Sequence, residues 1–443
     1  MDGDESELKP DLKEEAKIII KKCGRLPLAV ATVGGFMSAR PRNIIEWREF
    51  SERISEEFDN NPSLEMIKKI LASSYEGLTY HLKSCFLYMS IFPEDSDIRY
   101  RRLLRRWTAE GYSRATRNRS NEKVAEEQFT ALLNKSMIQQ SKTIASGKTG
   151  FCQVYNLMRE VIISKSEEEN LVFVLDDHIT SRSKDKVRHL VVSENWSREK
   201  KDMQNIVDVS HIRSLTVFGE WRSFFLSKKM RILRVLDLEG AYGLQDTDLV
   251  PIGKLRHLKY LSLRGSFQIF NLPNSFGNLL NLETLDIRGT WVTKLPTTIG
   301  RLENLKYLYA GMPSDDEEDT RSWVPTPTST ILQVFRAYMS NEEEVGMGLR
   351  YFVSLIMLFI SGWLRNLDLF GVKVPRGIGR LRSIHTLSVV NIARGKAMLK
   401  NLKKLTQLRK LGVTGINKSN CKELCSAIAD HGRLQSLLLR AEG

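Results

Sequence analysis

A repeated leucine pattern constrains the fold more than any other feature of this 443-residue sequence. The pattern L-x-x-L-x-L, with aliphatic substitutes, begins at Val187, Ile212, Leu233, Leu258, Leu282, Leu305, Leu364, Ile384, Leu408 and Leu434. Successive starts are mostly 21 to 26 residues apart. A unit of this length cannot bury its apolar side alone, so neighbouring units must stack. The second half is therefore expected to be a solenoid of short strands.

The segments that return between these strands repeat as well. Residues 272–279 and 295–302 both read L-P-x-x-[FI]-G-x-L and lie 23 residues apart. This period and pattern are typical of a leucine-rich-repeat solenoid, to which we assign residues 181–443. An inserted loop is expected near 311–330, where the acidic run 314–319 leads into a proline-containing stretch. We interpret the run as a solvated spacer, with an acidic docking loop as the alternative.

Alternation along the strands predicts which side chains face the concave side of the solenoid. The residue after the opening aliphatic is often basic, as at Arg188, Arg213, Arg234, Lys259, Lys306 and Arg409. Stacking would bring these residues into a rough column near three tyrosines, and such a surface suits recognition of an acidic protein. The predicted protein-binding residues are Arg234, Lys259, Tyr260, Lys306, Tyr307 and Tyr309. The alternative is a solvated positive ridge without a ligand.

The first half has helical periodicity. We expect a helical domain over residues 1–62 and a winged-helix-like domain over 63–180, in which two strands flank Ser146 and Gly147. A helix starting near Tyr100 and reaching Trp107 carries several arginines, namely Arg99, Arg101, Arg102, Arg105 and Arg106. We interpret them as a solvated face and not as phosphate contacts. The expected architecture is therefore helical and winged-helix-like subdomains followed by an α/β leucine-rich-repeat solenoid.

Signals for enzyme chemistry are weak in this sequence. The nearest match to the phosphate-binding pattern G-x-x-x-x-G-K-[ST] is Gly147-Lys148-Thr149, but Lys142 stands at the required first glycine. No catalytic triad or clustered carboxylate pair stands out, so we expect no enzyme. Cys421 and Cys425 have only His431 near them, which is too few ligands for a zinc site.

Charge and cysteine content restrict partners and location. The net charge is +14, but charges of both signs are interspersed, so nucleic acid is an unlikely partner by this criterion. Five cysteines without a C-x-x-C pair fit a reduced, cytoplasmic setting. The sequence contains no apolar run of the ~18 residues that a transmembrane segment needs, and its acidic first residues do not resemble a secretory signal.

Three motifs resemble those of the plant nucleotide-binding leucine-rich-repeat disease-resistance proteins, of the coiled-coil type. Residues 24–29 read GRLPLA, similar to the family's G-L-P-L-A motif. Residues 85–95 read CFLYMSIFPED and resemble C-F-x-Y-x-x-x-F-P-E-D, while residues 107–112, WTAEGY, resemble W-x-A-E-G-F. The repeats then follow in the family's order. The resemblance implies an intracellular immune receptor that recognises pathogen effectors or guarded host proteins and switches between ADP and ATP.

The resemblance also implies cofactor contacts. Leu26 and Pro27 would lie near the adenine, and the family's M-H-D motif would fall at Val154-Tyr155-Asn156. Its histidine, which normally contacts the ADP phosphates, is replaced by Tyr155, and its aspartate by Asn156. Tyrosine donates a hydrogen bond but carries no positive charge, so this departure weakens the expected ADP contact.

Absence of the phosphate loop leads to two further expectations. The family's signalling and phosphate-loop subdomains would precede residue 1, so the resemblance implies an N-terminally truncated receptor, with self-association in a full-length form. ADP or ATP binding by this chain alone should then be very weak. The alternative function is a stand-alone repeat adaptor or decoy without a nucleotide switch.

Overall fold

The computed structural model describes residues 10–23, 27–38, 41, 43–52, 62–143, 147, 149–179, 186–311, 371–393, 396–429 and 431–441. The chain divides into two compact units. The first comprises residues 1–173 and 187–189, and the second comprises residues 174–186 and 190–443.

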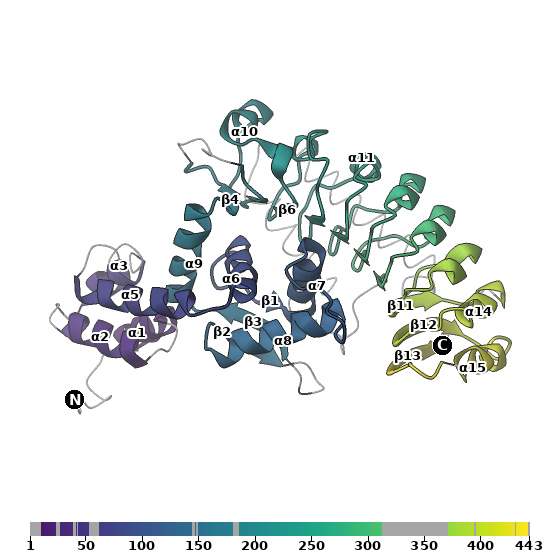
Figure 1. The fold of residues 1–443 in the computed structure, drawn as a ribbon, viewed down its shortest axis with the longest axis horizontal. Helices are drawn as coiled ribbons and strands as arrows, with labels where there is room; N and C mark the ends of the chain where they lie inside the picture. Colours follow the sequence, from purple (N-terminus) through teal and green to yellow (C-terminus); the bar gives the residue numbers. More distant parts are fainter. Residues whose placement is uncertain are drawn as a thin grey trace. The chain divides into compact units, whose positions relative to one another are not determined.

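The first unit begins with a group of helices, namely α1 (Pro10–Lys22), α2 (Pro27–Ser38), α3 (Ile44–Glu52) and α5 (Pro62–Glu76) (Figure 1). Helix α1 packs against α3, and α2 packs against α5. A buried hydrogen bond of 2.5 Å from Ser51 Oγ to Glu15 Oε1 joins α1 to α3. Pro27 opens α2, where the missing N–H of proline costs nothing.

A winged-helix arrangement follows, as the sequence predicted. Its elements are α6 (Tyr80–Leu87), η2 (Tyr88–Ile91), β1 (Ile98–Arg99), α7 (Tyr100–Glu110), α8 (Asn121–Asn134), β2 (Ile138–Thr143), β3 (Thr149–Val154) and α9 (Asn156–Glu168). The strands form an antiparallel sheet in the order β1-β3-β2. The β2–β3 hairpin confirms the strand pair expected around Gly147, which has a φ of +76°.

Helix α7 supplies much of the winged-helix core. Leu103, Leu104 and Trp107 are buried, and Trp107 has no exposed surface. The helix ends at Gly111, whose φ of 88° places it in the left-handed region that suits a glycine after a helix. These residues follow the apolar spacing that predicted the helix.

The interpretation of the arginines in and just before α7 as a solvated face was wrong for Arg99, at the end of β1, and for Arg106, on α7, because both are buried. Arg106 Nε donates a hydrogen bond of 2.9 Å to the Tyr88 hydroxyl, and its guanidinium lies 5.2 Å from the ring centroids of Tyr88 and Phe92. The physical reason is that a guanidinium can be buried when its donors find partners and its faces stack on aromatic rings.

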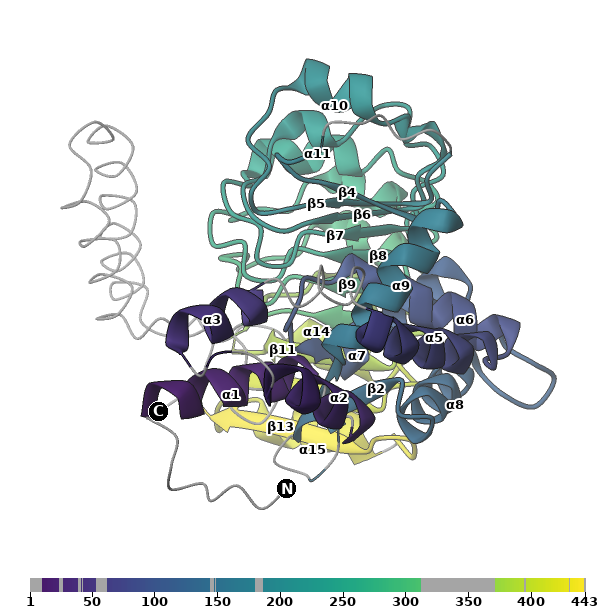
Figure 2. The same ribbon diagram turned by 90° about the vertical axis from the view of Figure 1, so that its left-hand side faces the viewer.

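The second unit is built on a parallel ladder of short strands (Figure 2). The full sheet has the order β13-β12-β11-β10-β9-β8-β7-β6-β5-β4. Its strands are β4 (Val172–Leu175), β5 (His189–Val192), β6 (Ser214–Val217), β7 (Val235–Asp237), β8 (Tyr260–Ser262), β9 (Thr284–Asp286), β10 (Tyr307–Tyr309), β11 (Thr386–Asn391), β12 (Lys410–Ile416) and β13 (Ser436–Ala441). Each described copy of the leucine pattern contributes one strand, so the solenoid prediction is confirmed.

Short helical segments return between the strands. They are α10 (Lys200–Ile206), η3 (Val209–His211), η4 (Ser223–Phe225), η5 (Asp246–Asp248), α11 (Leu249–Ile252), η6 (Asn274–Asn278), η7 (Thr297–Arg301), η10 (Arg376–Arg380), α14 (Lys396–Leu402) and α15 (Cys421–Ala429). Leu236, Leu261 and Leu285, one from each of three adjacent strands, have no exposed surface. The core of this unit therefore lies between the strands and the returning segments, as the repeat predicted.

Glycines in the returning segments permit close stacking of neighbouring repeats. A Cβ added at Gly277 would lie 2.5 Å from the Cβ of Thr298, and one added at Gly300 would lie 2.5 Å from the carbonyl oxygen of Gly377. Any side chain at these positions would push the next repeat away. This requirement explains the glycine of the repeated L-P-x-x-[FI]-G-x-L pattern.

The sheet is continuous between the strands that precede and follow residues 312–370 in the sequence. Strands β10 and β11 pair directly in parallel, with Tyr307 opposite Thr386 and Leu308 opposite Leu387. The repeat copy expected at Leu364, the acidic run 314–319 and most of the expected loop 311–330 lie outside the described residues.

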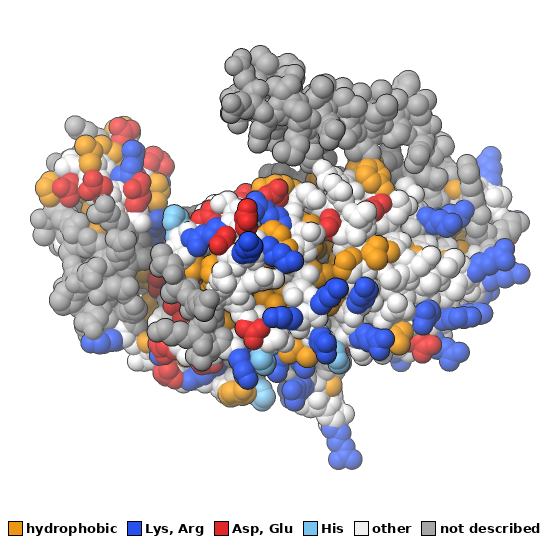
Figure 3. Space-filling view, turned by 90° about the horizontal axis from the view of Figure 1, so that it is seen from above, with side chains coloured by type: hydrophobic (Ala, Val, Ile, Leu, Met, Phe, Trp, Pro, Cys, Tyr) orange, Lys and Arg blue, Asp and Glu red, His pale blue; other side chains and the backbone are white. Residues whose placement is uncertain are grey.

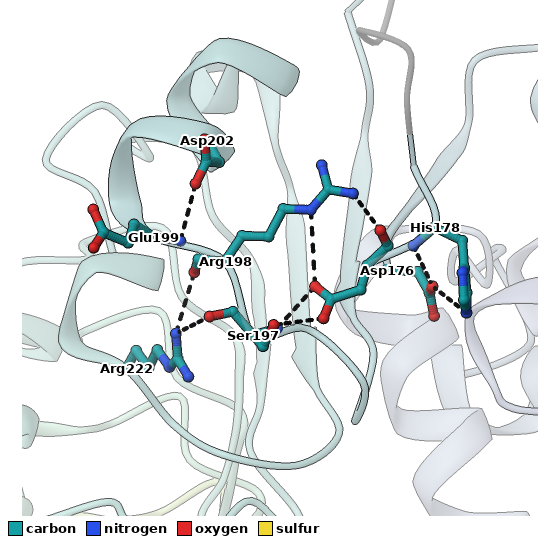
Figure 4. A network of polar contacts seen from close by, with 8 residues as sticks. Asp176, His178, Ser197, Arg198, Glu199, Asp202 and Arg222 are labelled. Carbon is teal, nitrogen blue, oxygen red and sulfur yellow. Dashed lines mark hydrogen bonds and ion pairs between the residues drawn. The ribbon is translucent and has the colours of Figure 1, made fainter.

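A polar network ties together the loops at the start of the second unit (Figure 4). Ser197 donates to Asp177 from its backbone N–H, at 3.0 Å, and from its hydroxyl, at 2.5 Å. The Arg222 guanidinium donates to the carbonyl oxygens of Ser197 and Arg198. The two hydrogen bonds from Ser197, followed by the nearby Arg198 charge, lower the pKa of Asp177 below its usual range.

Candidate functional site

The strand side of the repeats carries an aligned column of side chains. From Arg234 onward, each backbone N–H in the column donates to the carbonyl oxygen of the preceding column residue, over 2.7 to 2.9 Å. We call this set the recognition column, and it consists of Arg213, Arg234, Lys259, Glu283, Lys306, His385, Arg409 and Gln435. The predicted residues Arg234, Lys259 and Lys306 therefore belong to one backbone ladder, and each comes from a different repeat.

An acidic residue interrupts the positive charge of the recognition column. Glu283 Oε1 accepts from Lys259 Nζ at 3.0 Å, and Glu283 Oε2 accepts from Lys306 Nζ at 2.9 Å. Glu283 is the least exposed of the three side chains, with 15% of its surface accessible against 36% for Lys259 and 24% for Lys306. Two of the predicted cations are therefore held by one carboxylate, and the middle of the column is less positive than its composition suggests.

The three predicted tyrosines differ in accessibility. Tyr260 and Tyr309 have only 2% and 1% of their surface exposed, whereas Tyr307 is half-buried. The rings of Tyr307 and Tyr309 stack with a centroid distance of 6.5 Å and an interplanar angle of 8°. Tyr307 also meets the His385 ring edge-on at 5.9 Å. Of the three tyrosines, Tyr307 is the one best placed to contact a partner, and the binding role of all six predicted residues stays a prediction.

Tyr309 is in contact with a buried ion pair formed by Arg288 and Asp286. Arg288 donates to Asp286 through Nε, at 3.0 Å to Oδ1, and through a terminal nitrogen, at 2.6 Å to Oδ2. The Arg288 guanidinium also lies 4.4 Å from the Tyr309 ring centroid. This two-pronged pairing with a stacked ring fixes the tyrosine beside the column.

A second candidate region lies where β3 meets α9. Three side chains from this stretch hold the turn at residues 92–95. Asn156 Nδ2 donates to Glu94 Oε1 at 3.1 Å, an Arg159 guanidinium nitrogen donates to the carbonyl oxygen of Phe92 at 3.2 Å, and Gln153 Nε2 donates to that of Asp95 at 3.2 Å. Burial lowers the pKa of Arg159, against the raising effect of Glu94, Glu160 and Asp95. Two motifs 60 residues apart in the sequence thus form one junction.

The predicted cofactor residues are only partly placed. Tyr155 is the N-cap of α9, with extended backbone angles and no side-chain cap hydrogen bond, and it is half-buried. Asn156 is the first residue of that helix and contacts Glu94. Leu26 lies outside the described residues, and only the backbone of Pro27 is described, at the start of α2. Their contact with a nucleotide stays a prediction.

Other motif residues build the core of the first unit. The Tyr112 hydroxyl and His189 Nε2 lie 2.7 Å apart, and Tyr88 meets both rings edge-on. Glu110 and His189 are buried, with Glu110 Oε1 3.8 Å from His189 Nδ1. Burial, followed by the Glu110 charge, raises the pKa of Tyr112. Motif residues that carried the family resemblance therefore act here as packing and hydrogen-bonding groups.

The described residues were also considered as possible metal ligands and membrane spans, and neither is found among them. That part of the chain contains no group of three or more His, Cys, Asp and Glu side chains placed to hold a metal ion. Cys421 and Cys425 are both exposed and not joined in a disulfide. None of the described helices has the length and apolar character needed to cross a membrane.

Comparison with known families matches two stretches of the chain. Residues 91–162 match the winged helix domain of disease resistance proteins, and residues 211–321 match a leucine-rich repeat region. The first stretch includes the β3–α9 junction, and the second includes the recognition column from Arg213 to Lys306. The matched regions thus cover the β3–α9 junction and the first five residues of the recognition column.

Similar proteins occur in rice and Arabidopsis. Disease resistance protein Pik-2 of Oryza sativa subsp. japonica is 30% identical over 96% of this chain and 40% of its own length. Disease resistance protein RGA4 of the same species is 34% identical over 74% of this chain and 32% of its own. Among solved structures, the leucine-rich-repeat ectodomain of the plant membrane receptor kinase GASSHO1/SCHENGEN3 from Arabidopsis thaliana covers 58% of this chain and 27% of its own, with 15% identity and a TM-score of 0.32.

The fold and the matched regions define a protein that joins a winged helix to a leucine-rich-repeat solenoid. With its winged helix of the disease-resistance type, the chain belongs to the disease resistance proteins of plants. It spans about two fifths of the length of Pik-2.

Sequence reasoning missed two residues of these regions. Glu283 occupies the column position in its repeat, so the repeat register alone placed it between Lys259 and Lys306. Only basic residues were considered at this position of the repeat, and Glu283 was therefore passed over. Arg159 follows the M-H-D-like stretch, but its contact with the Phe92 carbonyl oxygen has no signature in the sequence, because a backbone acceptor can belong to any residue.

Proposed function

We propose that this chain works in a plant immune receptor, where its repeats recognise a pathogen effector or a guarded host protein and the receptor then signals defence. The role is that of a cytoplasmic interaction protein and not of an enzyme. The observation that carries the proposal is the recognition column, because one backbone ladder joins the residues that directly precede eight consecutive described strands, β6 to β13. The proposal is also supported by the relatives of this chain, which are named disease resistance proteins.

The charge order of the column indicates what it would recognise. Lys259 and Lys306 are bound to Glu283, so a partner that approaches the middle meets a partly neutralised surface. Arg213 and Arg409 lie outside this pair, toward opposite ends of the row, and Arg409 is exposed. Acidic groups of a partner would be favoured at the two ends and would compete with Glu283 in the middle. Such an arrangement favours a specific protein surface over uniform negative charge.

A pairwise interaction screen of the full chain against secreted pathogen proteins and host proteins tests recognition. For any partner found, the dissociation constant is measured with the variant Arg213→Glu/Arg409→Glu and with the control Lys200→Glu/Lys201→Glu on α10. We expect the column variant to weaken binding at least about tenfold, the equivalent of 1.4 kcal/mol, and the control to match the parent. Equal affinities of the column variant and the control variant would contradict the proposal that the recognition column binds the partner.

A nucleotide switch is the second part of the proposal. By the family resemblance, ADP or ATP binds with its adenine near Leu26 and Pro27 and with a phosphate near Tyr155 and Asn156. The start of α9 supports this placement, because helix N-termini favour anions and the α9 N-cap carries no side-chain hydrogen bond. Tyr155 supplies a neutral donor where a histidine would supply a charged one. The missing charge-assisted bond corresponds to about 1.5–3 kcal/mol.

The substitution Tyr155→His tests this second part in a chain extended with a phosphate-loop domain of the same family. ADP release should become slower than in the unchanged extended chain. Asn156→Asp serves as the comparison, since it would replace the Asn156–Glu94 hydrogen bond by two facing carboxylates. Equal ADP release with tyrosine and histidine, together with intact partner binding, would instead favour a repeat adaptor or decoy without a switch.

A further inference from the structure

Almost all of the net positive charge lies in the last repeats. Residues 371–441, which we call the basic segment, contain fifteen Lys and Arg and two Asp and Glu, a net charge of +13 out of +14 for the whole chain. The same segment contains no phenylalanine, tyrosine or tryptophan. The even mixing of charges that made nucleic acid an unlikely partner therefore holds for the rest of the chain but not for these repeats.

The charges of the basic segment gather on neighbouring elements. Helical turn η10 packs against α14, and the stem of Lys404 lies beside Gly379, next to Arg380. Figure 3 shows the Lys and Arg side chains concentrated toward the right-hand end of the molecule, whereas both signs mix elsewhere. We call the exposed basic side chains on η10, α14 and the turns that follow them the basic patch, which consists of Arg376, Arg380, Arg382, Lys400, Lys403 and Lys404.

The basic patch is not neutralised from within. Throughout the described ranges of the chain, none of its six side chains forms an ion pair. Lys403 Nζ donates to the Ser426 hydroxyl at 2.9 Å, a neutral contact that leaves its charge in place. Like charges gathered on one surface repel each other, and this arrangement is relieved when a dense counter-charge binds.

The composition of the segment restricts that counter-charge. Protein interfaces are enriched in aromatic residues, and single-stranded nucleic acid is held by aromatic stacking, yet the segment has no aromatic residue. Stable membrane attachment combines charge with an apolar anchor. Within the described part of the segment, the large apolar side chains that are exposed are Leu437 and Leu439, which lie on β13 and not on the patch elements. Duplex nucleic acid can be bound through its phosphates without aromatic stacking, because it carries one negative charge per about 1.7 Å of its axis.

We propose that the basic patch binds the phosphate backbone of duplex nucleic acid without reading its sequence. Each lysine or arginine would neutralise a phosphate and release a counterion, so the binding should depend steeply on salt. The patch has no role in the recognition column, and this inference therefore stands or falls independently of the proposed immune function.

Fluorescence anisotropy with two labelled DNA duplexes of unrelated sequence tests the proposal on the full chain, from about 50 to about 200 mM salt. We expect both duplexes to bind equally. The variant Arg380→Glu/Arg382→Glu/Lys404→Glu should bind at least about tenfold more weakly at low salt. It should also lower the slope of log affinity against log salt by about three, one for each lost phosphate contact.

The control variant reverses three exposed lysines elsewhere on the repeats, Lys200→Glu/Lys201→Glu/Lys228→Glu, and should keep the parent slope. Glutamine at the same three patch positions gives a milder second variant, and circular dichroism verifies the folding of each. The proposal is overturned if the parent chain fails to bind at low salt, or if patch and control variants lose affinity equally. It is also overturned if phosphatidylserine vesicles or polyglutamate bind more tightly than the duplexes.

Discussion

The winged-helix region and the repeats use polar residues in opposite ways. In the first unit, the buried Arg106 donates to the hydroxyl of Tyr88, 18 residues away, and the half-buried Tyr112 contacts His189, 77 residues away. In the repeats, side-chain contacts run within one repeat or to the next one, as when Lys259 and Lys306 both bind Glu283. The first region therefore depends on contacts distant in sequence, and the second on neighbours.

This difference bears on function. A core of interlocked motif residues leaves little room to change one of them without disturbing the others. A repeat array can vary its strand-side residues one at a time, because each leucine core remains local. Under the proposed function, the repeats are the region where recognition can diversify, and the motif residues of the winged helix are the ones that must stay together.

The largest effect is expected from Trp107→Ala. Trp107 is fully buried on α7, so its removal should cost about 3–5 kcal/mol of unfolding free energy. Hydrogen exchange followed by mass spectrometry should show lost protection across the winged helix, from β1 to α9. With Trp107→Phe as a milder control, a loss confined to α7 would contradict the interlocked core.

A smaller and local effect is expected from Leu285→Ala on β9. The side chain is fully buried, and such a truncation costs about 2–5 kcal/mol. In a solenoid the loss should centre on β8, β9 and β10, because each repeat contacts its neighbours. The exposed Leu280→Ala provides the control. Equal loss of exchange protection from β5 to β13 would show that the repeats unfold as one block. It would contradict the expectation that each repeat depends mainly on its neighbours.

The smallest effect concerns Asp177 and pH. Its folded pKa is lowered by the Ser197 hydrogen bonds, so its contribution is present above the usual carboxyl pKa and is lost as the pH falls through the lowered value. Asp177→Asn should therefore reduce exchange protection of the loops near Ser197 at neutral pH, and this effect should fade as the pH falls below the lowered pKa of Asp177. Ser197→Ala should remove most of that difference, whereas a pH-independent effect would assign the network a purely geometric role.

Periodicity explains which parts of the fold were predictable. A repeat places every residue in register, so the strands and the buried Leu236 and Leu285 followed from the sequence. Register does not predict pairing, and the bridge from Glu283 to two lysines required the structure. Arg106 was misjudged because amphipathic patterns count a charge as surface, whereas Tyr88 and Phe92 supply it with a buried environment.

The candidate sites were predictable to different degrees. Tyr155 and Asn156 were identified by motif resemblance, but the partner Glu94 lies 62 residues away and comes close only through the fold. The column residues were identified by spacing, while the burial of Tyr260 and Tyr309 depends on packing that alternation does not report. The basic patch required the position of charges along the chain, which an overall net charge conceals.

We infer that this chain provides a binding scaffold and that tight nucleotide binding needs a phosphate cradle, for which its sequence shows no motif. A neutral hydrogen bond from Tyr155 would contribute about 1 kcal/mol, whereas even millimolar affinity requires about 4 kcal/mol. Isothermal titration of the purified chain with ADP and magnesium measures this directly. We expect a dissociation constant weaker than about 1 mM. A dissociation constant in the low micromolar range would contradict it and would reveal a phosphate site within these 443 residues.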